Sequence, residues 1–306
     1  MLFRSERGNW ELLSSRVTTS PLAGVWARSA NEYYAVGSNG TVLLRTGIGA
    51  GGSWARVASG VTSSSLNAVH GYSTGVSVLP DVYAVGVDGT ILHMSSTGSG
   101  WAVEGVALTS AELTSVWVGA DSVWVVGRGG RIGKKLSGSW SPENGPGNMP
   151  VTQDLYAVWG TGAGASQVTF VGGSMGTLLR RAGGTWTQEA SGLTTQTIVA
   201  LFGSGENDLY AFCDGGATLH RVGGTWRLEN VRQFTSSISG VSGSLVPGTS
   251  STEYYAAGKQ GLLLHFGNNS WNSEPPLTTL TASSISAATS TDVVAVGANG
   301  LILHKY

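Results

Sequence analysis

The sequence predicts an all-β protein built as a single seven-bladed β-propeller, in which four-stranded antiparallel blades form a closed ring. The first observation is a tryptophan that follows a short turn seven times, at spacings of 44, 47, 39, 46, 40 and 45 residues: Trp10, Trp54, Trp101, Trp140, Trp186, Trp226 and Trp271. The second is that 35 residues follow Trp271, so the spacing across the two ends of the chain is also 45. A period of this length is typical of propeller blades, and its continuation across the ends predicts that both ends lie in one blade.

Each repeat contains four short segments with the residue pattern of strands, as its first complete copy shows. Residues 22–26 are apolar and predict the first strand, and residues 33–37, with the sequence Tyr-Tyr-Ala-Val-Gly, predict the second. The Asn39-Gly40 pair that follows accepts the positive φ of a two-residue hairpin, and the pairs Asp88-Gly89 and Asn299-Gly300 repeat it. Residues 41–44 predict the third strand, and Trp54 opens the fourth.

The blades predicted in this way account for residues 1–306 as one domain without a linker. Their approximate ranges are 20–63, 64–110, 111–152, 153–195, 196–236, 237–279, and a composite seventh made of 280–306 plus 1–19. In the seventh blade, the C-terminal residues supply three strands and the segment around Trp10 supplies the fourth. Pairing the two ends within one sheet leaves no incomplete blade with an exposed edge.

The repeated motifs resemble those of known propellers. The turn before the tryptophan, best seen in 183–186 and 223–226 with the sequence Gly-Gly-Thr-Trp, resembles a degenerate Asp-box of sialidase-type propellers. The longer unit, Ala-Val-Gly, then Gly-Thr-Ile-Leu-His, then Gly-Gly-Thr-Trp, is similar to the repeats of photosystem II assembly-factor-type propellers and of myxobacterial envelope propellers. Arg181 and Arg221 stand where an Asp-box has its aspartate. The resemblance therefore implies a propeller over the whole chain but carries over no enzymatic residue.

Composition excludes several classes of protein. With 17 Lys+Arg against 18 Asp+Glu the net charge is -1, which gives no electrostatic basis for nucleic-acid binding. No apolar run approaches the roughly 18 residues of a membrane span, so no membrane insertion is expected. The single cysteine excludes a disulfide within the chain and a cysteine-based zinc site. No motif calls for a metal or another cofactor, and the sequence assigns no oligomeric state.

Aligning the repeats produces three polar columns, each with a structural interpretation. The histidine column of the third strand contains Leu44, His93, Lys134, Arg180, His220, His265 and His304. Because neighbouring sheets pack about 10 Å apart, these side chains are not expected to share a metal ion. The next residue along is often basic and is expected to extend into solvent: Arg45, Lys135, Arg181, Arg221 and Lys305. An acidic column before the second strand is expected to accept backbone N–H groups: Glu32, Asp81, Asp208, Glu253 and Asp292.

A fourth column, at the end of the innermost strand, is the candidate binding site. Its residues in blades one to five are large: Trp26, His70, Trp117, Trp159 and Phe202. Ser242 and Thr289 take the place of these rings in blades six and seven. First strands line the central channel of a propeller, so this arc is expected to border the mouth of the channel, where aromatic surfaces suit sugar rings or apolar peptide anchors. The structural alternative is that the rings pack between adjacent blades.

These observations predict a non-enzymatic binding or assembly scaffold that recognises a protein or a glycan through one face of the ring. One alternative is a carbohydrate-binding lectin. Another is a propeller lyase or glycoside hydrolase with its site at the channel mouth, but its candidate residues, His70, Glu206 and Asp214, are scattered over different blades. The low charge and the Ser-, Thr- and Gly-rich loops favour a secreted or envelope-associated protein, with a cytoplasmic location as the alternative.

Overall fold

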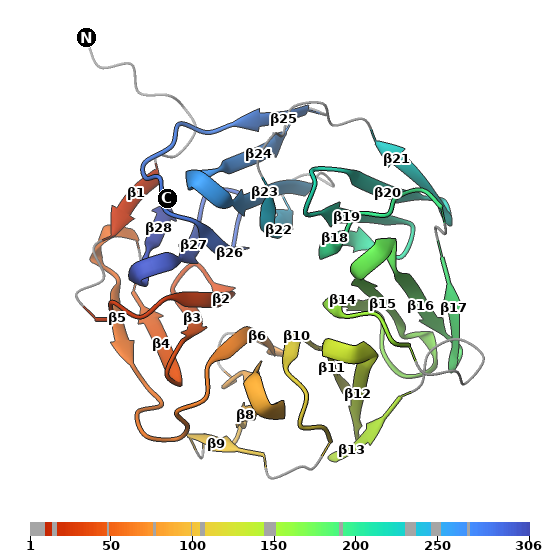
Figure 1. Ribbon diagram of the computed structural model, residues 1–306. Coiled ribbons are helices and arrows are strands. Elements are labelled where there is room, and N and C mark those ends of the chain that lie inside the picture. The colour runs from red at the N-terminus through yellow and green to blue at the C-terminus, as the bar shows by residue number, and fades with distance from the viewer. Residues whose placement is uncertain are drawn as a thin grey trace.

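A computed structural model of the chain describes residues 10–13, 17–47, 49–75, 78–98, 100–104, 108–143, 151–189, 192–229, 237–245, 252–267 and 270–306. It confirms an all-β fold of seven four-stranded antiparallel blades around a central opening (Figure 1). Three blades are β2–β5 (Leu22–Ser29, Glu32–Gly37, Thr41–Thr46, Ser53–Arg56), β6–β9 (Leu66–Tyr72, Asp81–Gly86, Ile91–Met94, Trp101–Val103) and β10–β13 (Leu113–Val118, Ser122–Gly127, Arg131–Leu136, Ser139–Pro142).

The remaining blades follow the same order along the chain. They are β14–β17 (Leu155–Thr161, Val168–Gly173, Leu178–Ala182, Thr185–Gln188), β18–β21 (Ile198–Gly205, Asp208–Cys213, Thr218–Val222, Thr225–Glu229), β22–β25 (Ile238–Leu245, Thr252–Gly258, Leu263–Gly267, Ser270–Ser273), and β26–β28 (Ala282–Ala287, Val293–Gly297, Ile302–Lys305) with β1 (Trp10–Leu13). In every sheet the first strand, in sequence order β2, β6, β10, β14, β18, β22 and β26, lies innermost (Figure 1).

The seventh blade closes the ring as predicted. β1 pairs with β28 in an antiparallel ladder that runs from Trp10 opposite Lys305 to Leu13 opposite Ile302. Figure 1 shows β1, in red, beside the blue strands of the C-terminal end. The outer strand of this blade therefore comes from the other end of the chain, and β1 covers the edge that β28 would otherwise expose.

The turns between second and third strands explain the Asn-Gly and Asp-Gly pairs. Asn39 has a φ of 55° and Gly40 a φ of 60°, and the N–H of Thr41 donates to the carbonyl of Ser38 at 3.2 Å. Two consecutive positive φ values are those of a type I′ turn, as predicted, but the ladder pairs Gly37 with Thr41 and so leaves three residues in the loop rather than two. Glycine is required at the second position because a Cβ on Gly40 would lie 1.9 Å from the carbonyl oxygen of Thr62 in the chain that leads to the next blade.

Short 3₁₀ segments occur in the turns and connections: η1 (Gly49–Gly51), η2 (Val87–Gly89), η3 (Arg128–Gly130), η5 (Gly164–Ser166), η6 (Ser174–Gly176), η7 (Lys259–Gly261) and η8 (Ala298–Gly300). The described residues contain no helix long and apolar enough to cross a membrane. Regular structure in the described chain is therefore almost wholly β.

The hydrophobic core lies between the blades and is divided into seven parts. The part between the first two blades joins Tyr34 and Val36 of β3 to Leu66 of β6 and Val82 of β7. Second strands are covered on both faces by neighbouring blades, so consecutive residues such as Ala35 and Val36 are both fully buried. This two-sided burial accounts for the unbroken apolar run of the Tyr-Tyr-Ala-Val-Gly segment.

Candidate functional site

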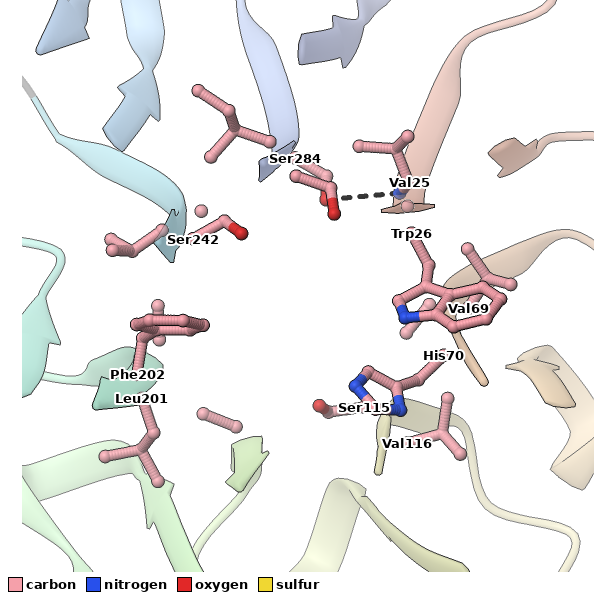
Figure 2. Close-up of a pocket in the computed structure, with 18 of the residues that line it drawn as sticks. Val25, Trp26, Val69, His70, Ser115, Val116, Leu201, Phe202, Ser242 and Ser284 are labelled. Carbon is pink, nitrogen blue, oxygen red and sulfur yellow. Dashed lines mark hydrogen bonds between the residues drawn. The ribbon is translucent and has the colours of Figure 1, made fainter. Parts of the chain in front are cut away.

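The candidate site is a cavity of about 340 Å³ on the axis of the ring, lined by the seven first strands. Figure 2 shows Trp26 and His70 on one side of it and Phe202 and Ser242 on the other. None of the residues that line this cavity is an aspartate, glutamate, lysine or arginine. The site that the fold creates is therefore polar and aromatic but carries no formal charge from these residue types.

The first-strand column assembles at this cavity in blades one to six, at the positions that the sequence predicts. Strand register places its members at one level, because each lies opposite the same position of the second strand: Trp26 opposite Tyr34, His70 opposite Tyr83, Trp117 opposite Trp124, Trp159 opposite Phe170, Phe202 opposite Tyr210 and Ser242 opposite Tyr255. All six residues line the cavity.

The assignment for the seventh blade was wrong by three residues. Ser286, not Thr289, lies opposite Val294 and lines the cavity. Thr289 lies beyond the end of β26, in the connection to β27, where its hydroxyl accepts the N–H of Asp292 at 2.9 Å. Ser286 precedes Val294 by eight residues, just as Trp26 precedes Tyr34, so aligning the repeats on the second strand would have given Ser286.

The aromatic members of the column also pack between blades, as the structural alternative expected. A Cβ added to Gly71 of the second blade would lie 2.6 Å from the indole of Trp26, which shows that this ring covers the glycine. Phe202 covers Gly243 in the same way, and Trp117 covers Gly160 at 3.0 Å. Each ring is thus a wedge that one blade inserts over a glycine of the next.

The smaller, polar members of the column make hydrogen bonds instead of wedges. Ser286 accepts the N–H of Ala27 at 2.9 Å, and Ser242 accepts the N–H of Ala287 at 3.0 Å. His70 Nδ1 accepts the N–H of Val118 at 3.0 Å. In each case the acceptor is the column residue of one blade. The donor is a backbone N–H in the next blade, from the residue directly after that blade's own column residue. Where the column residue is small or polar, the next blade therefore keeps a side chain, and where it is a wedge, the next blade has glycine.

His70 is the histidine of the cavity, and its hydrogen bond fixes its tautomer. Because Nδ1 accepts a backbone N–H, the proton of the neutral ring is on Nε2. Burial lowers the pKa of His70 to about 4, so the ring is neutral at physiological pH. The ring centroid lies 5.9 Å from that of Trp26 and 6.5 Å from that of Trp117. His70 is thus an uncharged N–H donor between two indoles.

The indoles of the cavity have N–H groups that the protein leaves unpaired. Within the described chain, the Nε1 atoms of Trp26, Trp117 and Trp159 have no hydrogen-bond acceptor. None of these three atoms is fully enclosed by protein, so each remains accessible. Figure 2 shows the indole nitrogen of Trp26 facing the open centre of the cavity. By contrast, the outer-strand indoles of Trp186 and Trp226 donate to glutamates of the preceding blade, at 3.3 and 2.6 Å.

The basic column does not extend into solvent, so that expectation was wrong. Arg45, Arg221 and Lys305 are at most 5% exposed. Arg221 donates to Glu189 of the preceding blade at 3.2 Å and lies over the ring of Phe170 at 5.3 Å. No local sequence pattern indicates these partners, because the acid and the ring come from the neighbouring blade and are far away in the sequence.

The glutamates that pair with these cations form a repeated motif that is visible in the sequence but was not predicted as a contact. They stand three residues after the outer-strand tryptophan, as Glu104, Glu143, Glu189, Glu229 and Glu274. At three successive interfaces, the glutamate binds both the cation and the tryptophan Nε1 of the next blade: Glu104 with Lys135 and Trp140, Glu143 with Arg181 and Trp186, and Glu189 with Arg221 and Trp226. We call this unit the Glu–cation–Trp latch.

In the described residues the acidic column binds side chains, above all those of the histidine column, and not the backbone N–H groups that were expected. Nε2 of His93 lies 2.7 Å from Asp81, and Nε2 of His304 lies 2.9 Å from Asp292. His220 and His265 have the equivalent partners Asp208 and Glu253. Both residues of each pair belong to one hairpin and are 12 positions apart. This regular spacing is visible in the sequence and could have predicted the pairs.

The residues considered for catalysis are not brought together. Glu206 binds Arg180, and Asp214 accepts the N–H of Thr197 at 3.2 Å, both away from the residues that line the cavity. Burial raises the pKa of the Cys213 thiol to about 12, which leaves it protonated and unreactive. In the described part of the chain, no cluster of three or more His, Cys, Asp or Glu side chains has the geometry of a metal site.

Comparison with known proteins shows a likeness of fold. No protein-family model matches the chain, and no curated protein matches it either. Among solved structures, YCF48 from Cyanidioschyzon merolae is 16% identical with a TM-score of 0.70, covering 97% of this chain and 98% of that one. A structure of YCF48 bound to a D1 peptide gives 16%, 0.71, and 98% of both chains. The WD40 β-propeller domain of Doa1 is 13% identical with a TM-score of 0.76, covering 98% of this chain and 97% of that one.

An enzyme also has this architecture. Streptogramin B lyase is 12% identical with a TM-score of 0.76, and the match covers 97% of this chain and 96% of that one. At these identities the likeness shows the seven-bladed fold alone, because the same fold carries binding proteins and enzymes. Function has to be argued from the cavity.

Proposed function

We propose that the ring is a non-enzymatic binding scaffold that holds a segment of a partner protein at the mouth of the central cavity. The observation that carries this proposal is the set of aromatic rings and unpaired N–H donors in a cavity without acidic or basic side chains. Such a site offers contact area and hydrogen bonds. The low charge and loop composition support a partner in a secreted or envelope compartment.

A peptide is favoured over a glycan by the kind of polar group available. The indoles of Trp26, Trp117 and Trp159 and the imidazole of His70 offer N–H donors, which suit the carbonyl oxygens of a peptide. Sugar hydroxyls both donate and accept, so they would use only half of their capacity on these side chains. The structure of YCF48 with a bound D1 peptide supports the proposal by analogy, since YCF48 is a propeller of similar fold that binds a peptide.

An enzymatic function is disfavoured by the chemistry of the cavity. Lyases and glycosidases need groups that transfer protons, and glycosidases need two carboxyl groups roughly 5 to 10 Å apart. The residues that line the cavity include no carboxylate, and its one histidine has a pKa of about 4, too low for a general base of normal strength at neutral pH. We therefore propose binding without catalysis.

The test is a pair of arrays, one of peptides and one of glycans, probed with the purified protein. The variants Trp26→Ala and Trp117→Ala remove rings from the cavity, and Trp54→Ala removes an outer-strand ring as a control. Circular dichroism verifies that each variant is folded. We expect peptide binding that weakens at least tenfold in both cavity variants and stays unchanged in the control.

Two results would contradict the proposal. Binding confined to the glycan array, and lost in the cavity variants, would favour a lectin. Peptide binding that is equally strong in all three variants would place the interface elsewhere on the ring.

A further inference from the structure

This inference rests on the proposed function and specifies what the cavity binds. We infer that the N–H groups of Trp26, His70, Trp117 and Trp159 form a row of donors that receives uncharged carbonyl oxygens of an extended polypeptide backbone. The four residues come from β2, β6, β10 and β14, which belong to four consecutive blades. The rest of the cavity wall, with Phe202, Ser242 and Ser286, has no equivalent row.

The donors are available because the protein does not use them. Nδ1 of His70 is occupied by the N–H of Val118, which leaves the proton of Nε2 without an acceptor in the described residues. The same holds for Nε1 of the three cavity indoles, whereas Trp140, Trp186 and Trp226 on the outer strands donate to glutamates. An unpaired donor in a half-buried site is satisfied by water or by a ligand that offers an acceptor.

The absence of charge around the donors decides between neutral and anionic acceptors. No lysine or arginine lines the cavity, and His70 is uncharged at neutral pH, so a carboxylate or phosphate would lose hydration without gaining an ion pair. An amide carbonyl has a much smaller desolvation cost, and a hydrogen bond from an indole or imidazole N–H compensates for it. The cavity therefore selects neutral acceptors.

The spacing of the rings fits the repeat of a polypeptide backbone. Ring centroids of Trp26, His70 and Trp117 are separated by 5.9 and 6.5 Å. In an extended chain, carbonyl groups on the same side recur every second residue, at about 6.6 to 6.8 Å. The spacing of these three rings is close to that repeat, and for this reason we assign the row to a polypeptide backbone rather than to a single side-chain amide.

The experiment follows the tryptophan indole N–H resonances of ¹⁵N-labelled protein by NMR during titration with N-acetyl-trialanine amide, an uncharged peptide without a functional side chain. The sequence has 11 tryptophans, and Trp→Phe variants assign their indole signals. We expect saturable shifts of Trp26, Trp117 and Trp159. The indoles of Trp140, Trp186 and Trp226, which are bound to glutamates, are internal controls that should not move.

Sodium acetate and maltotriose, titrated to the same concentration, distinguish the chemistry of the acceptor. We expect neither to shift the three cavity resonances as strongly as the peptide does. A His70→Phe variant retains a ring but removes the Nε2 donor, together with the Nδ1 acceptor of Val118. With the fold verified by circular dichroism, it should weaken peptide binding by about two- to tenfold, the effect of one hydrogen bond. Trp117→Phe tests a second donor in the same way.

Three outcomes would overturn the inference. Cavity resonances that do not move with the peptide, or that move more with acetate or maltotriose, would each reject neutral backbone carbonyls as the occupant. Unchanged affinity in both Phe variants would show that rings, not N–H donors, bind. If the arrays detect peptide binding while this titration fails, the scaffold proposal stands and only the donor row is rejected.

Discussion

At the scale of single residues, the first-strand column combines two duties in one position. Its rings border the cavity and also cover glycines of the neighbouring blade, so a change there alters both the site and the packing of the ring. The glycine under each wedge is as necessary for the packing as the ring itself, because a larger residue would overlap the ring. This pairing gives the first prediction.

Gly71→Ala should destabilise the protein by about 1 to 3 kcal/mol, because the new methyl group overlaps the indole of Trp26. Combining it with Trp26→Leu, which shortens the wedge, should cost less than the sum of the two single changes. Urea unfolding measures all three variants. Gly205→Ala is the matched control, since no atom lies within 4 Å of the added Cβ; an equal loss in both alanine variants would contradict the wedge.

His93, a member of the histidine column, has an unusual pKa that follows from its structural contacts. Burial lowers its pKa, but hydrogen bonds to Asp81 and Glu104 outweigh burial and raise the pKa to about 9. Lys135 binds the same Glu104, whose pKa is lowered to about 2, against its burial, by hydrogen bonds from His93, Lys135 and Trp140. The histidine is therefore a cation over most of the physiological range.

A raised pKa in the folded state makes stability depend on pH in a defined direction. The contribution of His93 should be fully present below about pH 6.5 and should be lost as the pH rises through about 9, by on the order of 2 kcal/mol. Urea unfolding across this range should show the loss in the native protein and a flatter profile in His93→Gln. An NMR titration in which His93 deprotonates near pH 6.5 would reject this account.

Residue positions within a blade were predicted well, and contacts with the next blade were predicted poorly. Trp26 and Phe202 line the cavity as expected, because strand alternation and short turns fix the register inside each sheet. The partners of Arg221 and Lys305 were missed because no local pattern states which glutamate of another repeat faces them. Only the Trp-x-x-Glu spacing, repeated in five blades, carried that information.

At the scale of elements, the latches are unevenly distributed around the ring. The position that holds glutamate in blades two to six is Val57 in the first blade and Leu13 in the seventh. Correspondingly, the indole nitrogens of Trp101 and Trp54, which would donate to a glutamate at these two positions, are enclosed without a hydrogen-bond partner. The two interfaces of the first blade thus lack the glutamate of the latch, whereas the interface of the sixth and seventh blades keeps Glu274 and Lys305 but leaves Nε1 of Trp10 enclosed without a partner.

Val57→Glu should complete part of the missing latch between the first and second blades. The N–H of Val57 donates to the carbonyl of Val42 at 3.0 Å, the same contact that Glu189 makes with Leu178, so the backbone is already in place. A carboxylate there gives Trp101 an acceptor, and we expect a gain of about 0.5 to 1.5 kcal/mol in thermal or urea unfolding.

Val103→Glu is the control for this gain. Val103 is 50% exposed on an outer strand, and a glutamate there meets no enclosed donor, so stability should change little. A similar gain from both substitutions would indicate a general effect of charge rather than a completed latch.

At the scale of the whole molecule, the ring closes without a break between blades. The chain enters the seventh blade as β1 and continues to β2 in the first, so every interface between blades is crossed by a continuous segment of chain. The sequence predicted this closure from the spacing of Trp10 and Trp271 across the ends. It did not predict the donor row of the cavity, because the Nε1 atoms of Trp26 and Trp186 are alike in sequence and differ only in what faces them.

The closure of the seventh blade also determines how the protein responds to mechanical force. Trp10 and Lys305 are opposite each other at the end of the β1–β28 ladder, close to the two chain termini. Tension applied through the termini therefore loads this pair first and peels the four-residue ladder one pair at a time, instead of shearing all of its hydrogen bonds together. In an optical trap, the first extension should occur at low force and release β1 alone, with the six other blades still folded.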